Sequence, residues 1–214
     1  MDAAAAALLR PEGEPGRDYL IRRGLHPGTW LAWQLGFAPL YDPTAGKKRQ
    51  AIVVPWFDME PGAETITAVK YRFIDERPHG LRYLSRRGSL PILFGLWSAV
   101  PGGDTLLLVE GEINAISVWQ CRPAGVTCFS FGSDGGSHPE VLAAAARSYR
   151  RVFVWADDPG RALGIRAALG RQAIPVQSAT RERAKLDANA LLQDGLLPEF
   201  LNGLLGVRCL GIMV

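Results

Sequence analysis

Acidic side chains stand directly after two short apolar runs in the second half of the chain. Glu110 follows residues 106–109 (LLLV), and Asp157 and Asp158 follow residues 152–156 (VFVWA). Carboxylates that gather in one place repel one another unless a cation holds them, and oxygen-only ligand sets suit Mg²⁺ or Mn²⁺. The sequence therefore predicts a divalent-metal site whose ligands include Asp157 and Asp158, with Glu110 as a further ligand or as a general acid or base.

The elements around these acids are predicted to be strands followed by helices. Continuous apolar runs of this length are typical of strands buried on both faces of a parallel sheet. Gly111 predicts a tight turn, the apolar spacing that follows it predicts a helix over residues 113–119, and a second helix is expected over 161–171. Ligands bind beyond the carboxyl ends of the strands in such sheets, so parallel neighbours would bring the acids together.

Shorter elements are expected to complete the second half of the chain. A third strand is expected within residues 122–129, and a last strand over 173–177. Residues 140–149 have the composition of a strong helix. Residues 188–205 are also expected to be helical, with a break near Gly195.

The first hundred residues predict helices followed by a small antiparallel sheet. Helices are expected over residues 17–24 and 29–35, with residues 36–39 ending the second helix. The elements expected after them are a loop over 41–50, a strand over 51–58, a turn over 59–63 and a strand over 64–74. Ile66, Ala68 and Tyr71 cannot all share one face of this last strand, which predicts a bulge or an edge position.

Length and charge indicate two domains and a phosphate-binding segment. The chain has 214 residues, and the expected division is 1–100 and 101–214. The net charge is only +3, but residues 65–88 carry six basic and two acidic side chains. Such segments suit phosphate groups, with a solvated charged face as the alternative. The basic residues expected to bind phosphate are Lys70, Arg72, Arg82, Arg86, Arg87 and, beyond this segment, Lys185.

The cysteines and the apolar segments exclude several classes of protein. Cys121, Cys128 and Cys209 form no CxxC pattern and have no histidine at metal spacing, so no zinc site is expected. The sequence has no signal-peptide pattern and no apolar stretch of about 18 residues. We therefore expect a cytoplasmic protein with reduced thiols and no membrane segment.

Three segments resemble the Toprim domain, in the order in which that domain carries them. VEGEINAISVWQ (109–120) is similar to its glutamate motif. WADDPGRALGIRAA (155–168) is similar to its paired-aspartate motif, usually Asp-x-Asp followed by Ala-Gly. KLDANALL (185–192) resembles the Lys-Asp-Ala-Asn element that closes the Toprim region in phage-type and bacterial (DnaG-like) primases, and this resemblance implies Asp187 as a third ligand of the metal site.

Two further segments resemble the part of the primase core that precedes the Toprim region. YLIRRGLHPGTWLAWQLGFAP (19–39) is similar to its helical opening, in which Trp30 and Trp33 are expected to pack in the core. LRYLSRRGSLPILFGL (81–96) is similar to an element whose lysine meets nucleotide or template phosphate, and the matching residue is Arg82. The resemblance implies an α/β fold: a Toprim-like parallel sheet flanked by helices, preceded by a small α+β primase-core subdomain.

The resemblance also implies an activity, with two alternatives left open. The implied activity is that of a DNA primase-like nucleotidyltransferase, which uses Mg²⁺ or Mn²⁺, a single-stranded DNA template and nucleoside triphosphates, with a replicative helicase as a further partner. One alternative is a Toprim nuclease, although the primase-like segments 19–39 and 81–96 argue against it. The other is a catalytically reduced Toprim module that binds nucleic acid.

The sequence departs from the Toprim pattern at two places. Either Asp157 is the first aspartate and Pro159 takes the place of the second, or Asp158 is the second and Ala156 takes the place of the first. The residues that follow Asp158 favour the latter assignment. The aspartate often found four residues after the motif's glutamate is Asn114, and a neutral amide is a poorer metal ligand. These departures are the features that favour the reduced binding module.

Overall fold

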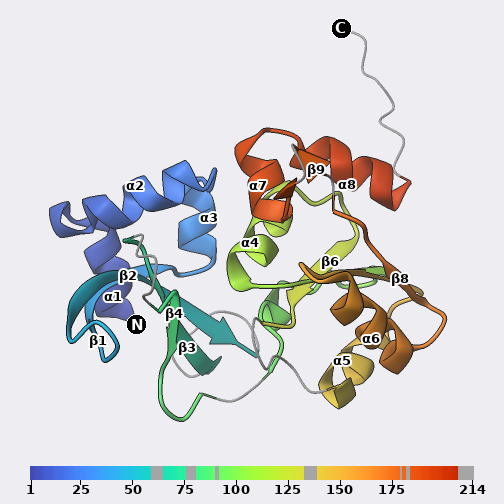
Figure 1. The fold of residues 1–214 in the computed structure, drawn as a ribbon, viewed down its shortest axis with the longest axis horizontal. Helices are drawn as coiled ribbons and strands as arrows, with labels where there is room; N and C mark the ends of the chain where they lie inside the picture. Colours follow the sequence, from blue (N-terminus) through green and yellow to red (C-terminus); the bar gives the residue numbers. More distant parts are fainter. Residues whose placement is uncertain are drawn as a thin grey trace, which may run out of the picture. The chain divides into compact units, whose positions relative to one another are not determined.

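The chain forms two compact units, Met1–Trp97 and Ser98–Val214, each with its own sheet (Figure 1). The computed structural model describes residues 1–58, 65–75, 81–89, 92–132, 139–178, 180–181 and 184–206. The sheet of the first unit is antiparallel and the four-stranded sheet of the second unit is parallel. This arrangement confirms the α/β fold class that the sequence predicts.

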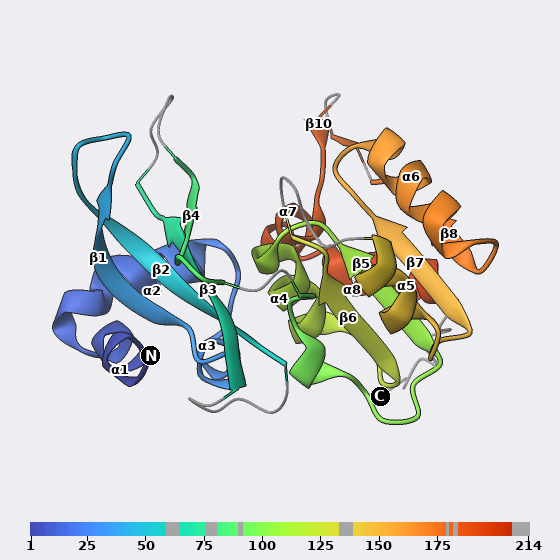
Figure 2. The ribbon, with the colours of Figure 1, turned by 90° about the horizontal axis from the view of Figure 1, so that it is seen from below.

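The first unit combines short helices with a four-stranded sheet in the order β1-β2-β3-β4 (Figure 2). Its helices are α1 (Asp2–Leu9), the 3₁₀ helix η1 (Pro11–Gly13), α2 (Glu14–Arg22) and α3 (Pro27–Ala32), and the 3₁₀ helix η3 (Leu96–Ser98) lies at its end. Its strands are β1 (Gly36–Asp42), β2 (Lys47–Phe57), β3 (Ile66–Phe73) and β4 (Tyr83–Ser85). Helix α1 packs against β1 and α2 against β2, so helices and sheet share one core.

The segment before β2 differs from the sequence prediction. Residues 36–39 do not end a helix and residues 41–50 do not form a loop, because β1 and β2 make a hairpin in which Asp42 pairs with Lys47. Pro39 and the charged residues around the turn resemble a loop in the sequence. A proline without an N–H is tolerated in β1, however, because β1 lies at the edge of the sheet.

A buried ion pair stabilises this hairpin. The carboxylate of Asp42 accepts hydrogen bonds from the backbone N–H groups of Thr44 and Ala45 at 2.8 and 3.2 Å. The guanidinium of Arg49 pairs with Asp42 and also with Asp75, at 2.5 and 2.8 Å. Arg49, which lies within the loop predicted over residues 41–50, is therefore a buried structural residue and not a surface cation.

The register of β2 and β3 confirms the predicted bulge. Trp56 pairs with Ala68 while the next residue, Phe57, pairs with Ile66, so Thr67 is an extra residue on β3. The turn expected over residues 59–63 lies outside the described residues.

An aromatic cluster fills the core of the first unit. Trp30 and Trp33 are both buried, as the sequence predicts. The ring of Trp33 stacks on Phe94 at 4.7 Å and meets Trp97 edge-on at 4.9 Å. Trp56 of β2 lies 5.4 Å from the same Phe94 ring, so Phe94 joins the helical segment to the sheet.

The second unit is built on a parallel sheet with the strand order β6-β5-β7-β8. Its strands are β5 (Thr105–Val109), β6 (Val126–Ser130), β7 (Arg151–Trp155) and β8 (Ala173–Pro175). All five residues of β5 and all five of β6 are buried, as expected of strands covered on both faces. A separate two-stranded ribbon pairs β9 (Thr180–Arg181) with β10 (Ala184–Lys185).

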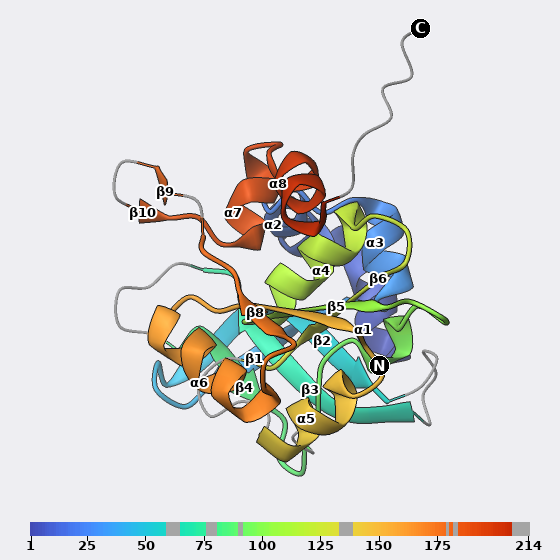
Figure 3. The ribbon, with the colours of Figure 1, turned by 90° about the vertical axis from the view of Figure 1, so that its right-hand side faces the viewer.

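Helices cover both faces of this sheet (Figure 3). The helices on one face are α4 (Glu112–Cys121), α7 (Ala188–Gln193) and α8 (Leu197–Leu205), and those on the other are α5 (Pro139–Ala146) and α6 (Pro159–Leu169). Gly195 lies between α7 and α8 with a φ of 73°, which confirms the predicted break. In the part of the chain that the structure describes, no helix has the length and apolar character needed to cross a membrane.

The strand order defines the switch point of the parallel sheet, which lies between β5 and β7. The chain passes from β5 outward to β6, then returns to the other side of β5 to form β7. Such a reversal opens a crevice between the two strands at their carboxyl ends. Glu110 follows β5 and Asp157 lies just beyond β7, so both acids stand at this point.

Candidate active site

Glu110 and Asp157 meet where β5 and β7 end. The two strands are paired with Val109 opposite Trp155, so the residues that follow are neighbours. The Glu110 carboxylate accepts a hydrogen bond from the backbone N–H of Asp157 at 3.1 Å. The Glu110 backbone N–H in turn donates to the carbonyl of Trp155 at 3.2 Å. The parallel pairing therefore fixes the backbone and the carboxylate of Glu110 against the end of β7.

Arg161 holds the other oxygen of Glu110. Its guanidinium lies 2.5 Å from Glu110 Oε1, and the two side chains are only 28% and 14% exposed. The guanidinium also lies over the ring of Phe131, 4.9 Å from its centroid. We did not predict Arg161 from the sequence. A positive charge in the first turn of a helix is unfavourable because it opposes the helix dipole. This position could have indicated from the sequence that Arg161 has an acidic partner.

The carboxylates of Glu110 and Asp187 influence that of Asp157. The pKa of Asp157 is raised, first by loss of hydration and then by the negative charges of Glu110 and Asp187, against the opposite effect of Arg161 and Lys185. Asp157 is exposed as a residue, but enough of the fold surrounds its carboxyl group to reduce its hydration. Lys185 Nζ donates to the backbone carbonyl of Asp157 at 3.3 Å.

Asp158 has a different environment from Asp157. It is the N-cap of α6, and its two oxygens accept the backbone N–H groups of Gly160 and Arg161 at 3.1 and 3.2 Å. Asp187 has a similar position at α7, where it accepts the N–H of Ala190 at 2.7 Å. Ala156, the other residue of the aspartate motif, is buried. The structure therefore brings together Glu110, Asp157 and Asp187, while Asp158 stabilises the start of a helix.

The acids have the oxygen-donor chemistry that suits a divalent cation, but the described side chains do not form a complete ligand set. No three of the described Asp, Glu, His and Cys side chains lie close enough together to hold one metal ion. The three acids are oxygen donors only, and their three negative charges exceed the two positive charges of Arg161 and Lys185, which also act on Asp157. Excess negative charge on oxygen ligands is the condition that favours Mg²⁺ or Mn²⁺. Asp157 and Asp187 would hold such an ion, with Glu110 beside it.

The predicted phosphate-binding residues fall into two groups. Lys185 lies beside Asp157 in the second unit. The others belong to the first unit, where Arg82, Arg86 and Arg87 are exposed. Arg72 donates to the Tyr19 hydroxyl at 3.1 Å and lies 4.7 Å from the Tyr83 ring centroid. Lys70 Nζ lies 4.7 Å from the Trp56 ring centroid.

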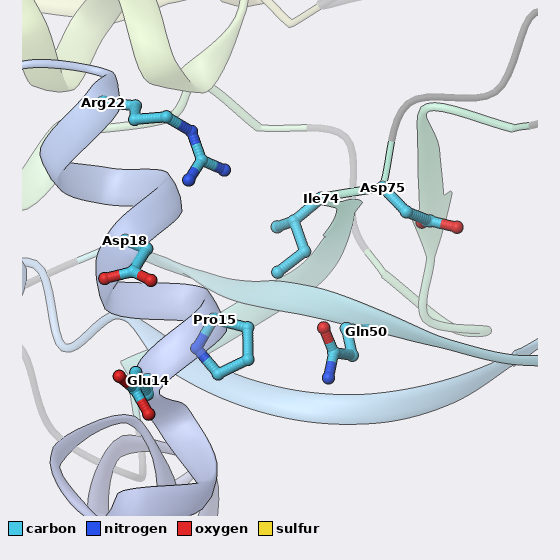
Figure 4. Close-up of a pocket in the computed structure, with 7 residues that line it drawn as sticks. All are labelled: Glu14, Pro15, Asp18, Arg22, Gln50, Ile74 and Asp75. Atoms are coloured by element: carbon cyan, nitrogen blue, oxygen red, sulfur yellow. The ribbon is translucent and has the colours of Figure 1, made fainter.

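A cavity of about 310 Å³ in the first unit is lined by more acidic than basic side chains, in contrast to the basic phosphate-binding residues (Figure 4). Two carboxylates of α2, those of Glu14 and Asp18, line it beside Arg22. Asp75 also lines it, but this carboxylate pairs with Arg49 at 2.8 Å. Acidic walls repel phosphate, so this cavity does not belong to the predicted phosphate-binding set.

Solved structures with the same fold are catalytic domains of primases. The RNA polymerase domain of Mycobacterium tuberculosis primase DnaG matches with a TM-score of 0.72 and 18% identity, over 97% of this chain and 80% of that chain. The Aquifex aeolicus primase, with its zinc-binding and RNA polymerase domains, matches with a TM-score of 0.69 and 19% identity. The match covers 96% of this chain and spans 58% of the Aquifex chain.

A DnaG primase catalytic domain bound to single-stranded DNA matches with a TM-score of 0.65 and 18% identity, over 90% of this chain and 74% of that one. No protein-family model and no curated protein matches the sequence. The chain therefore has the fold of a primase catalytic core. More particularly, it is the fold of the DnaG primases, which confirms at the level of the fold the resemblance found in the sequence.

Proposed function

We propose that the chain is a primase-like nucleotidyltransferase that depends on Mg²⁺ or Mn²⁺ and acts on a single-stranded DNA template. The observation that carries this proposal is the convergence of Glu110, Asp157 and Asp187 at the switch point of the parallel sheet. Among folds of this kind, that is the place where a ligand binds. The similarity to DnaG catalytic domains supports nucleotidyl transfer as the chemistry of the site.

Each acidic side chain has a separate proposed role in nucleotidyl transfer. A 3′-hydroxyl attacks the α-phosphorus of a nucleoside triphosphate, a new phosphodiester bond forms, and the bond to pyrophosphate breaks. Asp157 and Asp187 would hold the divalent cation, which when bound neutralises charge on the phosphate oxygens. Glu110, held by Arg161 and the Asp157 N–H, is proposed to accept the proton of the hydroxyl or to serve as a further ligand. Asp158 remains a predicted ligand, through lone pairs that its helix cap does not use.

The basic residues are assigned to phosphate groups. Lys185 is exposed beside Asp157 and is proposed to bind the triphosphate. Arg82, Arg86 and Arg87 are exposed and are proposed to bind the template backbone, together with Lys70 and Arg72. The solved neighbours include a DnaG catalytic domain with single-stranded DNA and a DnaG RNA polymerase domain with double-stranded DNA.

A catalytically reduced binding module is the second candidate function. Two observations favour it: Glu110 is already paired with Arg161, and both oxygens of Asp158 accept helix N–H groups. Such a module would bind single-stranded DNA without extending it. A replicative helicase as partner and a cytoplasmic location stay predictions from the resemblance.

A primer-synthesis assay separates these functions. The wild-type chain is incubated with single-stranded DNA, labelled nucleoside triphosphates and Mn²⁺, beside Glu110→Gln and the matched control Glu199→Gln, whose exposed carboxylate lies on α8. The proposal expects extended products that persist in the control and fall at least a hundredfold in Glu110→Gln. DNA binding without products would favour the binding module, and shortened DNA would indicate a Toprim nuclease.

A further inference from the structure

We infer that Asn114 is a positioning residue that joins Glu110 to the start of helix α7, and is not a weakened substitute for a metal ligand. This inference rests on the proposed function, because it concerns the spacing of the proposed metal-binding acids. It also contradicts the sequence-based interpretation, in which an amide at this position weakens the site. Asn114 lies on α4, and the hydrogen bonds of its side chain carry the inference.

Both the nitrogen and the oxygen of the Asn114 side-chain amide form hydrogen bonds. Its Nδ2 donates to the backbone carbonyl of Glu110 at 2.8 Å, and its Oδ1 accepts the backbone N–H of Asn189 at 2.9 Å. A carbonyl can only accept and a backbone N–H can only donate, so these partners determine which end of the amide is nitrogen. The side chain is therefore a two-sided bridge with a defined orientation.

The bridge joins two parts of the acid cluster that are distant in sequence. Glu110 directly follows β5, and Asn189 is the second residue of α7, whose N-cap is Asp187. A change in the length or direction of the bridge would therefore change the position of Glu110 relative to Asp187. Glu110 and Asp187 are the two acids whose negative charges act on Asp157.

A buried polar network between α4 and α7 holds Asn189, the residue at one end of the bridge. Asn189 is 1% exposed, and its Nδ2 donates to Ser117 Oγ at 2.9 Å. Ser117 in turn donates to the carbonyl of Ile113 at 2.7 Å, within α4. Gln193 donates to Asn189 Oδ1 at 3.0 Å, within α7. Because each buried member has a partner, the network specifies one packing of α7 on α4.

An aspartate could not replace this amide. An ionised carboxylate only accepts hydrogen bonds, so the substitution Asn114→Asp would leave the Glu110 carbonyl without its donor and would face that oxygen with negative charge. The new side chain would keep only the bond from the Asn189 N–H. It would also add a fourth carboxylate to a cluster that is already negatively charged. Restoring the aspartate of the Toprim pattern is therefore expected to damage this site.

The test compares Asn114→Asp and Asn114→Ala with two controls. Asn202→Asp places the same charge change on α8, and Leu142→Ala removes a buried side chain from α5 on the other face of the sheet. Each variant is measured for Mn²⁺ affinity by electron paramagnetic resonance, for thermal unfolding and for primer synthesis. Leu142→Ala shows what loss of stability alone does to Mn²⁺ affinity.

The inference makes two quantitative statements about Mn²⁺. Asn114→Ala binds Mn²⁺ at least threefold more weakly than the wild type, while Leu142→Ala and Asn202→Asp stay within threefold. Asn114→Asp does not bind Mn²⁺ threefold more tightly than the wild type, and its rate of primer synthesis falls. Tighter binding by Asn114→Asp, or unchanged binding by Asn114→Ala, would overturn the inference.

A failure of the proposed function can be distinguished from a failure of the Asn114 inference by the behaviour of the wild-type chain. A wild-type chain that binds no Mn²⁺ and makes no primers would reject the proposed chemistry. The bridge is then judged by hydrogen exchange in the same proteins. The Asn189 amide is expected to exchange at least tenfold faster in Asn114→Ala than in Leu142→Ala, and equal protection in the two variants would reject the bridge.

Discussion

Among single residues, Asp157 has the clearest link between charge and stability. Its raised pKa shows that the fold disfavours the charged carboxylate, because of burial and the neighbouring Glu110 and Asp187. Asp157→Asn removes the charge and keeps the shape. We expect a higher midpoint of thermal unfolding at pH 7, together with loss of Mn²⁺ binding. Differential scanning calorimetry checks the first effect, with the exposed Asp18→Asn as control.

The pH dependence of this effect has a definite sign. A raised pKa means that the folded chain binds the Asp157 proton more tightly than the unfolded chain, whose carboxyl has the ordinary value of 3.8. The penalty is therefore absent below that pH, grows as pH rises from 3.8 through the folded-state pKa, and is complete above it. The gain from Asp157→Asn should vanish below about pH 4. A gain that is equal at pH 3.5 and pH 7 would contradict this cause.

Asp158 can be tested by keeping its cap and removing its charge. Asp158→Ala should cost about 1 kcal/mol of unfolding free energy, because two N–H groups of α6 lose their acceptor. Asp158→Ser should restore most of that loss, since serine is also a good N-cap. Urea unfolding measures both. If Asp158→Ser keeps the stability but loses Mn²⁺ affinity more than tenfold, Asp158 is a metal ligand as well as a helix cap.

The sequence predicted where the acids lie better than it predicted which side chains contact them. Glu110 and Asp157 could be anticipated because both follow apolar runs, and parallel pairing brings strand ends together. The ion pair of Glu110 with Arg161 could not, because it depends on the direction in which a first-turn side chain leaves α6. The bridge formed by Asn114 depends in the same way on how α7 packs against α4.

At the scale of the elements, Phe94 holds the first unit together. It is 1% exposed and contacts the rings of Trp33 and Trp56, which belong to different segments. Phe94→Ala should cost about 3–5 kcal/mol of unfolding free energy, because it removes apolar contact and leaves a cavity. Tyr41→Ala on the exposed edge strand should change stability by less than about 0.5 kcal/mol. Similar losses in the two variants would show that this cluster is not the core.

The sequence predicted the elements of the second unit more accurately than those of the first. Strands β5 and β7 are continuous apolar runs, which are buried on both faces and easily recognised. Strand β1 was missed because it alternates in burial at an edge and contains Pro39. The burial of Arg49 was missed for a related reason, since Asp42 lies on the paired strand of an unpredicted hairpin and Asp75 lies 26 residues further along the chain. Periodicity reports local burial but not pairing between distant residues.

At the scale of the whole molecule, the proposed template contacts can be counted by salt dependence. The triple variant in which Arg82, Arg86 and Arg87 are each replaced by glutamine should bind single-stranded DNA with a weaker salt dependence. The slope of log affinity against log salt concentration should become less negative by about 2. This value follows from about 0.7 for each lost phosphate contact. Fluorescence anisotropy across a salt series measures the slope.

The matched control changes the same number of charges elsewhere. It replaces three exposed arginines of the second unit with glutamine: Arg147, Arg166 and Arg171. Its slope should stay within about 0.5 of the wild-type slope. Equal flattening in both triple variants would mean that net charge, and not the predicted basic segment, determines DNA binding.

The most direct test of the central claim is the nucleotide sequence of the products made on a defined single-stranded DNA template. With Mn²⁺ and all four nucleoside triphosphates, the wild-type chain should make products complementary to the template. The same reaction with Glu110→Gln should make at least a hundredfold less product. Complementary products would establish templated nucleotidyl transfer at the site of Glu110, Asp157 and Asp187. A wild-type chain that binds the template but makes no product, or makes products unrelated to its sequence, would contradict the claim.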